Sequence, residues 1–565
     1  IENWNLIFIC YLVLVIWDFI RRITSNLIVE EPYPMFVNMG RIFQQTALRY
    51  ADNPAVINVE RGRRFTYARM HELSNRLSHV LKQRFGLGQG DFYATILDND
   101  NMALFHPWML KSPVGAVWID VRDSVGEQTS RIDHVAPKLV FLENRLLPPL
   151  YEHLQACNID LVVMDRPEKS RPGVDYFWDL VEQAPAVEVE EEFTADNTSE
   201  HISVLRFTGG TTGIAKCAKY SLANLWLWGC NPAHFYETLP FDHPGALFFS
   251  PLHHAASGSV VIPVHIKGGA VITLNGADPE TIGRTIAAHR VDMIYAVPTV
   301  LYRMLEMNLP RKHNLSSLKT IRYGGSPISP AKLEILLELF GQIFVQGYGS
   351  TECWPSVTIL GRKDHGTQTQ EQIARLQSVG RPMPGEEVII CDEDGRVLPA
   401  GQRGEIRIRG PNTIAGYYKA PELTKKNFSG SGFWKSGDMG YMDEKGYLYL
   451  VDRKQDMIIT GGYNVYAIEV ENCLNSHPAI QNSAVVGLPH DLWGEEVRAM
   501  VMLVQGSTTS PAELIDHCKQ HLARYKAPKK IEIIDRLPLS PAGKVLRREV
   551  RQLLKERDKP DVELV

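Results

Sequence analysis

The residues with the clearest capacity for chemistry form a glycine- and threonine-rich stretch that ends in a lysine. Glycine lets the backbone turn tightly and approach a ligand closely. Threonine hydroxyls and successive backbone N–H groups form a concave anion site, to which the lysine adds a full positive charge. We therefore predict that this stretch binds a chain of phosphates, although similar short motifs also occur in turns that bind nothing. Its members are Thr208, Gly209, Gly210, Thr211, Thr212, Gly213, Ile214, Ala215 and Lys216.

This phosphate loop differs from the P-loop, whose pattern is Gly-x-x-x-x-Gly-Lys-Ser/Thr. Two residues separate Gly213 from Lys216, and Cys217 stands where a magnesium-binding hydroxyl would be. A strand-like run at residues 202–207 precedes the loop, and an apolar segment at residues 222–228 that could form a helix follows it. The P-loop class is therefore excluded, while a strand is expected to deliver the chain into the anion site.

A second segment, at residues 346–352, combines an aromatic ring with hydroxyls and a carboxylate. Tyr348 offers a flat apolar face on which a purine can stack. Thr351 can hydrogen-bond a phosphate oxygen, and Glu352 is a hard oxygen ligand of the kind that Mg²⁺ prefers. Taken alone the glutamate would pass as a surface residue. Combined with the phosphate loop, the segment indicates binding of a magnesium nucleotide.

Two further residues could complete such a site. Asp438 lies in a tight turn, where its carboxylate can accept two hydrogen bonds from a ribose diol. Near the C-terminus, Gly543 frees the backbone so that Lys544 can project from a Pro/Gly-rich loop. As isolated patterns these would be an ordinary turn aspartate and a solvated lysine.

These motifs, in this order, resemble the adenylate-forming superfamily of acyl-CoA synthetases, 4-coumarate–CoA ligases, luciferases and peptide-synthetase adenylation domains. The Thr-Gly-Gly form of the loop is most similar to the fatty-acyl-CoA synthetase branch, and the resemblance covers nearly all of the chain after about Pro32. It implies an α/β fold with a large N-terminal domain of sheets covered by helices, including a small β-barrel-like part. A small mobile α+β domain follows. We place the large domain at residues 25–453 and the small domain at residues 454–565.

The resemblance also implies roles for single residues. Its catalytic residues would be Lys544, Lys216, Glu352 and Thr351, with Glu352 holding the metal. Besides the phosphate loop, the residues expected to bind ATP or AMP are Gly324, Gly325, Ser326, Gly347, Tyr348, Gly349, Ser350, Thr351, Glu352, Asp438, Arg453 and Lys544.

The remaining implied roles concern the acid, coenzyme A and the hinge. His254, Ala255 and Gly324 would border the acyl pocket. Further candidates for the lining of this pocket are Trp226, Trp228 and Ala256. Gly461, Gly462 and Tyr463 would form a mobile loop that lines the coenzyme A tunnel. The hinge would be Gln455, where lysine or aspartate is commoner in relatives.

The implied activity is an ATP-dependent acid–CoA ligase that uses Mg²⁺. A carboxylic acid with a pKa near ~4 is already ionised at neutral pH, so it attacks the α-phosphorus without a general base. Catalysis is then mainly positioning and charge compensation, with Lys544 bridging the acyl carboxylate and the α-phosphate. The small domain would next turn about its hinge, and the coenzyme A thiol would displace AMP.

The acid is less well defined by the sequence. No aspartate stands between Phe248 and Ser259 to hold an α-amino group, so an amino-acid substrate is disfavoured. Small side chains at Ala255 and Ala256 favour a medium- or long-chain fatty acid, and an aromatic acid remains open. The chain also departs from the family: Ala215 and Cys217 replace the proline and glycine that usually flank the loop lysine.

Length, charge and cysteine content limit the number of domains and the other classes of protein to be considered. A chain of 565 residues is expected to form at least two domains. A formal net charge of −5 argues against a nucleic-acid-binding protein. The eight cysteines are scattered with no Cys-x-x-Cys spacing, so the pattern predicts neither a zinc site nor a secreted disulfide framework.

The N-terminal 1–24 segment is predicted to attach the protein to a membrane. Residues 6–17 are unbroken apolar, shorter than the ~20 residues of a spanning helix. Arg21 and Arg22 follow this run and would keep the catalytic domains on the cytoplasmic side. The alternative is an amphipathic or buried helix.

Three rival functions remain open. An acyl-AMP ligase would pass the acyl group to a carrier protein, and an aryl-acid–CoA ligase would differ only in its acid. A non-catalytic sensor of acyl groups or nucleotides is a further alternative. Luciferase-type oxidation ranks behind these because no local feature favours it.

Overall fold

The computed structural model describes residues 39–105, 111–166, 169–189, 201–208, 216–254, 260–540 and 544–558. The proposed membrane segment at residues 1–24, the loop residues Gly209, Gly210, Thr211, Thr212, Gly213, Ile214 and Ala215, and the pocket candidates Ala255 and Ala256 lie outside these ranges. Within them, no helix is both long and apolar enough to cross a bilayer.

A sheet of seven strands, within the described residues, occupies the N-terminal part of the molecule in the order β7-β6-β5-β3-β4-β8-β9. All neighbours run parallel except β8 and β9. Strands β3 and β5 are buried along their whole length, as expected for a parallel sheet with helices on both faces. The strands are β3 (Phe92–Ile96), β4 (Gly115–Trp118), β5 (Leu139–Leu142), β6 (Asp160–Val163), β7 (Val174–Tyr176), β8 (Ile202–Phe207) and β9 (Cys217–Ser221).

A second sheet follows the order β16-β15-β14-β13-β12-β10-β11-β1-β2. Its middle strands are parallel, and antiparallel pairs close both edges. The strands are β1 (Pro54–Asn58), β2 (Arg63–Thr66), β10 (Gly245–Phe248), β11 (Ala270–Thr273), β12 (Met293–Ala296), β13 (Thr320–Gly324), β14 (Phe344–Ser350), β15 (Cys353–Leu360) and β16 (Arg381–Pro382).

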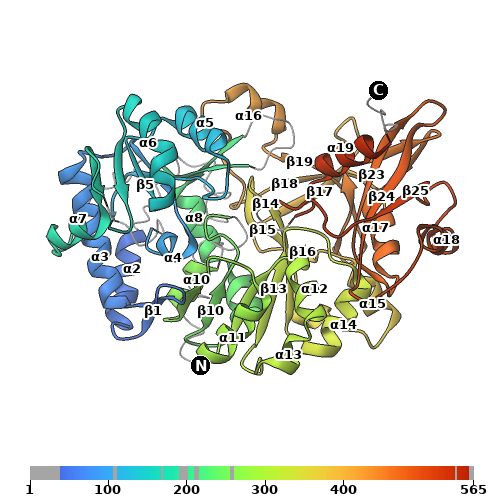
Figure 1. Cartoon of the computed structure of the whole chain (residues 1–565), viewed down its shortest axis with the longest axis horizontal. Helices are drawn as coiled ribbons and strands as arrows, with labels where there is room; N and C mark the ends of the chain where they lie inside the picture. The colour runs from blue at the N-terminus through green and yellow to red at the C-terminus, as the bar shows by residue number, and fades with distance from the viewer. Residues whose placement is uncertain are drawn as a thin grey trace, which may run out of the picture.

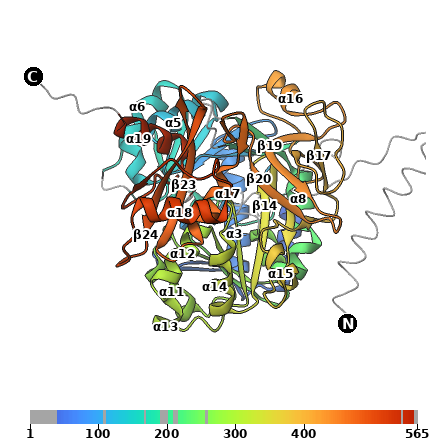
Figure 2. The same ribbon diagram turned by 90° about the vertical axis from the view of Figure 1, so that its right-hand side faces the viewer.

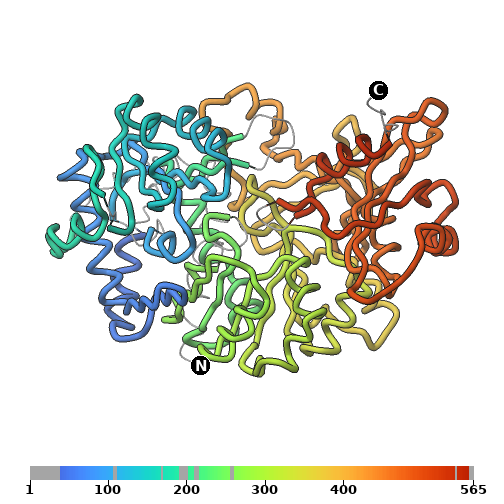
Figure 3. The backbone as a smooth tube through the Cα atoms, viewed as in Figure 1, coloured from blue at the N-terminus to red at the C-terminus, as the bar shows by residue number. Residues whose placement is uncertain are grey.

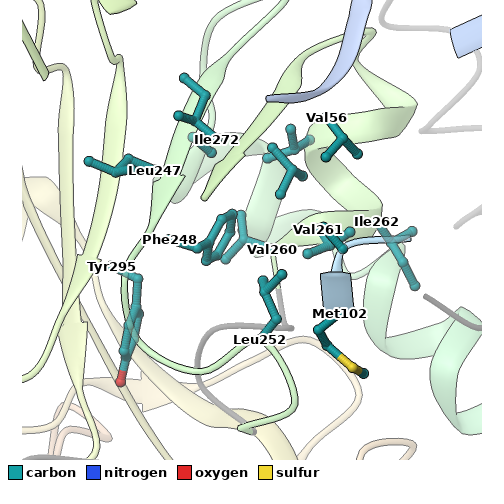
Figure 4. Close-up of a cluster of buried hydrophobic side chains, with 14 of the residues drawn as sticks. Val56, Met102, Leu247, Phe248, Leu252, Val260, Val261, Ile262, Ile272 and Tyr295 are labelled. Carbon is teal, nitrogen blue, oxygen red and sulfur yellow. The ribbon is translucent and has the colours of Figure 1, made fainter. Parts of the chain in front are cut away.

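Helices cover these sheets, and one continuous core joins the two (Figure 1). Figure 4 shows part of this core, where Phe248 of β10 and Leu252 pack beside Val260 and Val261. The α-helices are α2 (Met39–Arg49), α3 (Tyr67–His79), α4 (Asn99–Met102), α5 (Val125–Val135), α6 (Leu147–Ala156), α7 (Phe177–Gln183), α8 (Leu222–Gly229), α10 (Val261–Ile266), α11 (Pro279–His289), α12 (Pro298–Glu306), α13 (Leu309–Lys312), α14 (Pro330–Phe340) and α15 (Gln370–Arg375). Shorter turns are the π-helices Val80–Arg84 and His234–Thr238 and the 3₁₀ helices Asn144–Leu146 and Arg362–Asp364.

A four-stranded antiparallel sheet completes the large lobe and corresponds to the expected small β part. Its order is β17-β18-β19-β20, and helix α16 (Pro421–Asn427) lies between β18 and β19 in the chain. The strands are β17 (Glu387–Cys391), β18 (Gly404–Arg409), β19 (Trp434–Met442) and β20 (Leu448–Arg453).

The C-terminal lobe has its own sheet and core. It lies at the right in Figures 1 and 3 and faces the viewer in Figure 2. The strands are β21 (Ile458–Thr460), β22 (Tyr463–Val465), β23 (Ile480–His490), β24 (Gly494–Leu503) and β25 (Lys530–Ile533), and the helices are α17 (Ala467–Asn475), α18 (Pro511–His521) and α19 (Arg547–Arg557). Lys332 of α14 donates a 3.0 Å hydrogen bond to the Ile480 carbonyl, and Gln481 donates a 2.6 Å bond to Glu306, so the two lobes are in direct contact.

The sequence predicted a strand before the phosphate loop and a helix after it; the structure has an additional strand between the loop and that helix. Strand β8 and helix α8 lie where the sequence predicted them, but the unpredicted strand β9 intervenes and pairs antiparallel with β8. The loop therefore connects the two strands of a hairpin, with the Thr208 N–H donating to the Lys216 carbonyl at 2.8 Å. Ser221 and Asn224 form a capping box at the start of α8.

Candidate active site

Tyr348, Asp438 and Arg453 meet where β14, β19 and β20 approach one another. The Tyr348 hydroxyl donates a 2.7 Å hydrogen bond to Asp438 Oδ2, and Arg453 Nε lies 3.5 Å from Asp438 Oδ1. The sequence predicted that Asp438 lies in a tight turn; it lies instead within strand β19, as the direct cross-strand partner of Arg453 on β20. Burial raises the pKa of Asp438, while Arg453 and the tyrosine hydrogen bond oppose that rise. The sheet thus brings together residues that lie 90 and 15 positions apart in the chain.

Lys544 comes from the other lobe and reaches the same place. Its Cε lies 3.5 Å from the position that a Cβ on Gly325 would occupy. Removal of water from around the ammonium group lowers the pKa of Lys544 to about 8; Arg453 and Arg206 add to this effect and Asp438 opposes it. The predicted catalytic lysine is therefore placed beside the predicted nucleotide residues with its charge poorly hydrated.

Glu352 is buried and held by two hydroxyl groups. The Tyr417 hydroxyl donates to Glu352 Oε1 at 3.0 Å, and the Ser350 hydroxyl donates to Oε2 at 3.1 Å. Lys216 Nζ lies 5.6 Å from the centroid of the Tyr417 ring, so the loop lysine and the carboxylate border one space. Each carboxylate oxygen retains a lone pair, and such hard oxygen donors fit Mg²⁺.

The glycines of the two nucleotide motifs are required by close backbone packing. A Cβ on Gly324 of β13 would collide with the carbonyl oxygen of Gly347 on the neighbouring strand β14. A Cβ on Gly347 would lie 2.5 Å from Ser356 Oγ, and one on Gly349 would lie 2.8 Å from the Pro355 carbonyl oxygen. The fourth glycine, Gly325, has a φ of +83°, which favours glycine.

The predicted acyl side of the site contains buried basic groups. Burial, followed by Lys544 and Arg206, lowers the pKa of His254 well below its usual value. The adjacent His253 lies 3.4 Å from Asp120 Oδ2. Of the tryptophans suggested for this pocket, Trp228 instead stacks on Trp354 at 4.1 Å within the core, and Trp226 packs at its edge.

Two residues with evident contacts to the site were missed by sequence reasoning. Tyr417 orients Glu352, yet nothing in the sequence around it differs from an ordinary core tyrosine. Arg206 is 4% exposed and lies between the rings of Trp118 and Trp354, with its guanidinium carbon 5.8 and 5.1 Å from their centroids. The sequence did contain one indication that Arg206 is functional: a charged residue stands inside an otherwise apolar strand, two positions before the phosphate loop.

The expected coenzyme A loop lies apart from this cluster. Gly461 and Gly462 form the tight turn of the β21–β22 hairpin, with φ of +58° and +81°, and the exposed Tyr463 stacks on Tyr525 at 4.8 Å. By contrast, Gln455, Arg453, Ser326 and Lys544 all line a cavity of about 360 Å³ between the lobes. In this arrangement the lysine, and not the glycine hairpin, occupies the cleft.

The assembled geometry places Lys544 beside the Tyr348–Asp438–Arg453 cluster at a cavity between two lobes, as nucleotide binding would require. Comparison with known proteins identifies the class of enzyme. Residues 43–418 match the family described as AMP-binding enzyme, and residues 469–544 match the AMP-binding enzyme C-terminal domain. The chain therefore belongs to the AMP-binding enzyme family. By family and relatives it is an AMP-forming acid–CoA ligase, as the resemblance implied.

Several curated relatives share substantial identity. The medium/long-chain-fatty-acid–CoA ligase FadD8 of Mycobacterium tuberculosis is 35% identical over 66% of this chain, and the alignment spans only 65% of FadD8. A feruloyl-CoA synthase of an Amycolatopsis species is 38% identical over 62% of this chain and 70% of its own length. A long-chain-fatty-acid–CoA ligase of Escherichia coli is 30% identical over 94% of this chain and 97% of its own.

Solved structures share the same two-lobed fold. The amide bond synthetase McbA from Marinactinospora thermotolerans superposes with a TM-score of 0.78 at 28% identity, over 92% of this chain and all of its own. The expected α/β fold with a small C-terminal α+β domain is confirmed.

We predict that adenylate formation is lost as Lys544 deprotonates. The cationic form compensates phosphate charge, and its pKa is lowered to about 8, so kcat/KM for ATP–pyrophosphate exchange should fall as the pH rises through about 8. Lys544→Arg keeps its charge at every accessible pH, so its residual activity should lack this fall. A wild-type profile that stays flat well above pH 8 would contradict the assignment.

Tyr417→Phe should weaken use of magnesium-ATP because it removes the hydroxyl that orients Glu352. Loss of a group that orients a metal ligand typically costs ~10–100-fold in affinity, so KM for magnesium-ATP should rise at least about tenfold. Steady-state kinetics with varied magnesium-ATP measure this effect. Tyr418→Phe, which removes the hydroxyl of the next residue, is the matched control and should leave KM unchanged; equal effects in both variants would count against the role of Tyr417.

Proposed function

We propose that this protein is an ATP-dependent fatty acid–CoA ligase for medium- or long-chain acids, acting through an acyl-adenylate. In the first step the acid carboxylate attacks the α-phosphorus of ATP, giving acyl-AMP and pyrophosphate. In the second, the thiol of coenzyme A loses its proton and attacks the acyl carbon, and AMP leaves. The observation that carries the proposal is the position of Lys544, which reaches from the C-terminal lobe to Gly325, Asp438 and Arg453 of the large lobe.

The first step requires an anion to approach a polyanion, so the chain's contribution is charge compensation and alignment. Lys216 and the backbone N–H groups of the phosphate loop would bind the β- and γ-phosphates. Lys544 would lie between the carboxylate and the α-phosphate. Tyr348 would stack on adenine while Asp438 binds the ribose hydroxyls. Glu352 would hold Mg²⁺, which when bound neutralises phosphate charge.

The second step would follow rotation of residues 454–565 against residues 25–453 about Gln455. The ammonium of Lys544 would leave the cleft, and the Gly461–Gly462 hairpin would enter it. The two glycines with positive φ in the β21–β22 turn support this role for the hairpin. A turn without side chains can approach the narrow pantetheine part of coenzyme A closely. A thiol with a pKa near ~8.5 supplies some thiolate without a dedicated base.

The preference for a fatty acid rests on two lines of support. The relatives that align over 94% of this chain act, by their names, on long-chain fatty acids. The segment that carries His254 also lies directly beside an apolar core of Phe248, Leu252, Val260 and Val261 (Figure 4). Such surroundings favour an acid with a hydrocarbon body over a strongly polar one.

An aryl acid is the second candidate, and one observation favours it. Arg206 Nη1 is buried without a hydrogen-bond partner among the described residues, whereas the nearby His253 Nε2 contacts Asp120 Oδ2 at 3.4 Å. A polar ring substituent of an aromatic acid could accept a hydrogen bond from the Arg206 guanidinium. The relative named as a feruloyl-CoA synthase shares the highest identity of the three described above, 38%.

Lys544→Ala should separate the two half-reactions. Loss of the bridging ammonium should reduce ATP–pyrophosphate exchange by ~10³-fold, comparable to removing one strong electrostatic contact to a developing charge. Thioester formation from supplied acyl-AMP and coenzyme A should remain within a few-fold of wild type, because the lysine is absent from the cleft in that step. Equal loss in both assays would refute the assigned role.

The acid is identified by ATP–pyrophosphate exchange across fatty acids of graded chain length and a set of hydroxycinnamic acids. We expect kcat/KM to be highest for a medium- or long-chain fatty acid. A hydroxycinnamic acid that exceeds every fatty acid would establish the second candidate instead. Transfer to a holo-carrier protein but not to free coenzyme A would indicate an acyl-AMP ligase, and release of ADP with orthophosphate would exclude the whole reaction class.

A further inference from the structure

We infer that the C-terminal lobe carries a binding site for a thiophilic divalent transition metal such as Zn²⁺, formed by Cys473, His517 and His521. Cys473 lies on α17, and the two histidines lie one helical turn apart on α18. The three side chains offer one ligand atom each, and these atoms all lie within 4.8 Å of one another. The site is separate from the nucleotide cluster and goes beyond the proposed ligase activity.

The helix pairing explains why the donors converge. Residues four apart on a helix project from the same face, so His517 and His521 both point from α18 toward α17. Their ring centroids are 4.4 Å apart. Around a tetrahedral zinc with bonds of ~2.0–2.3 Å, ligand atoms are roughly 3.3–3.8 Å apart, so a shift of about 1 Å in the side chains closes the site.

Hydrogen bonds to backbone carbonyls orient both imidazole rings. His517 Nε2–H donates to the Cys473 carbonyl at 3.1 Å, and His521 Nδ1–H donates to the His517 carbonyl at 2.8 Å. Carbonyl oxygens only accept, so each ring must carry its proton on the bonded nitrogen and keep a lone pair on the other. Metal-binding histidines typically show this arrangement, in which a backbone carbonyl orients the ring.

Neighbouring groups help to hold the thiol in place. The Cys518 thiol, on the residue after His517, is hydrogen-bonded to Cys473. Ser476 Oγ donates to the Cys473 carbonyl at 2.7 Å and lies 3.2 Å from His517 Nε2, so it helps to hold both residues.

The donor set selects the class of metal and leaves one position open. One thiolate with two imidazoles suits Zn²⁺ or Co²⁺ and disfavours Mg²⁺ and Ca²⁺, which require oxygen. His477 packs edge-on against His517 at 5.1 Å, but its Nδ1 accepts the Ala479 N–H at 3.2 Å, so its neutral ring carries the proton on the other nitrogen. Water would therefore be the fourth ligand.

Chain spacing alone could not reveal this site. The cysteines show no Cys-x-x-Cys pattern, so the sequence predicted no zinc site, but such a pattern detects only ligands that are close together in the chain. Here the ligands are 44 and 4 positions apart and meet because α17 packs on α18. A second cluster, Asp133, His153 and Cys157, is a useful contrast, because His153 Nε2 is already 2.8 Å from Asp133 and all three residues are at least partly exposed.

The test is titration of the full-length chain with Co²⁺, after chelator treatment and in a non-thiol reductant. Thiolate coordination gives a ligand-to-cobalt charge-transfer band in the near ultraviolet, and Zn²⁺ should displace the cobalt and abolish the band. We expect one equivalent to bind wild type and Cys157→Ser alike. Cys473→Ser should lose the charge-transfer band, and His521→Gln should lower the affinity by at least about 100-fold.

His521 is exposed at the end of α18, so its substitution tests the site even if Cys473→Ser fails to fold. Ser476→Ala should retain the charge-transfer band and weaken binding about tenfold, as expected for a group that orients a ligand. Absence of a thiolate band in wild type would overturn the inference. A band that survives Cys473→Ser and His521→Gln but disappears in Cys157→Ser would assign the metal to the second cluster and also overturn it.

Discussion

The position of Lys544 between the two lobes dominates the electrostatics of the site, because the surrounding protein removes water from its ammonium group. Burial lowers the pKa of this lysine to about 8, so the cationic form carries a cost that a polyanionic ligand would relieve. Asp438 opposes the shift but is itself engaged by Tyr348 and Arg453. A phosphate bound beside this lysine, as proposed above, would stabilise its cationic form, which is electrostatic preorganisation of the kind that enzymes use for charged substrates.

A network of ion pairs connects this lysine to the junction between the lobes. Three residues after Lys544, Arg547 Nη2 lies 2.7 Å from Glu471 Oε2 on α17, and its Nη1 lies 3.5 Å from Asp456 Oδ2. Asp452, at the end of β20, accepts a hydrogen bond from the Ala467 N–H at the start of α17. Arg547 Nη1 also lies 3.9 Å from Asp452 Oδ1, so carboxylates on both sides of Gln455 contact one arginine. If the small domain rotates about Gln455, as proposed above, these ion pairs would have to change.

The glycines illustrate how motif residues serve packing as much as ligand contact. Gly324 and Gly347 face each other across the β13–β14 ladder with no room for a Cβ. This proximity brings Tyr348 and the loop that begins at Gly325 to one edge of the sheet. Ligand binding at the carboxyl ends of parallel strands is a general property of such sheets. The backbone spacing, set by small residues, determines where the aromatic and charged groups can meet.

The sequence by itself determined the family, the α/β class, strand β8 and helix α8, because local periodicity and short motif spacings carry that information. It missed strand β9, since nothing local distinguishes Cys217–Ser221 from the end of a loop. It also missed Tyr417, Arg206 and the pairing of Cys473 with His517, which are distant in the chain from the groups they contact. Only the tertiary structure decided these, because such contacts arise from packing of strands and helices rather than from any local preference of the residues involved.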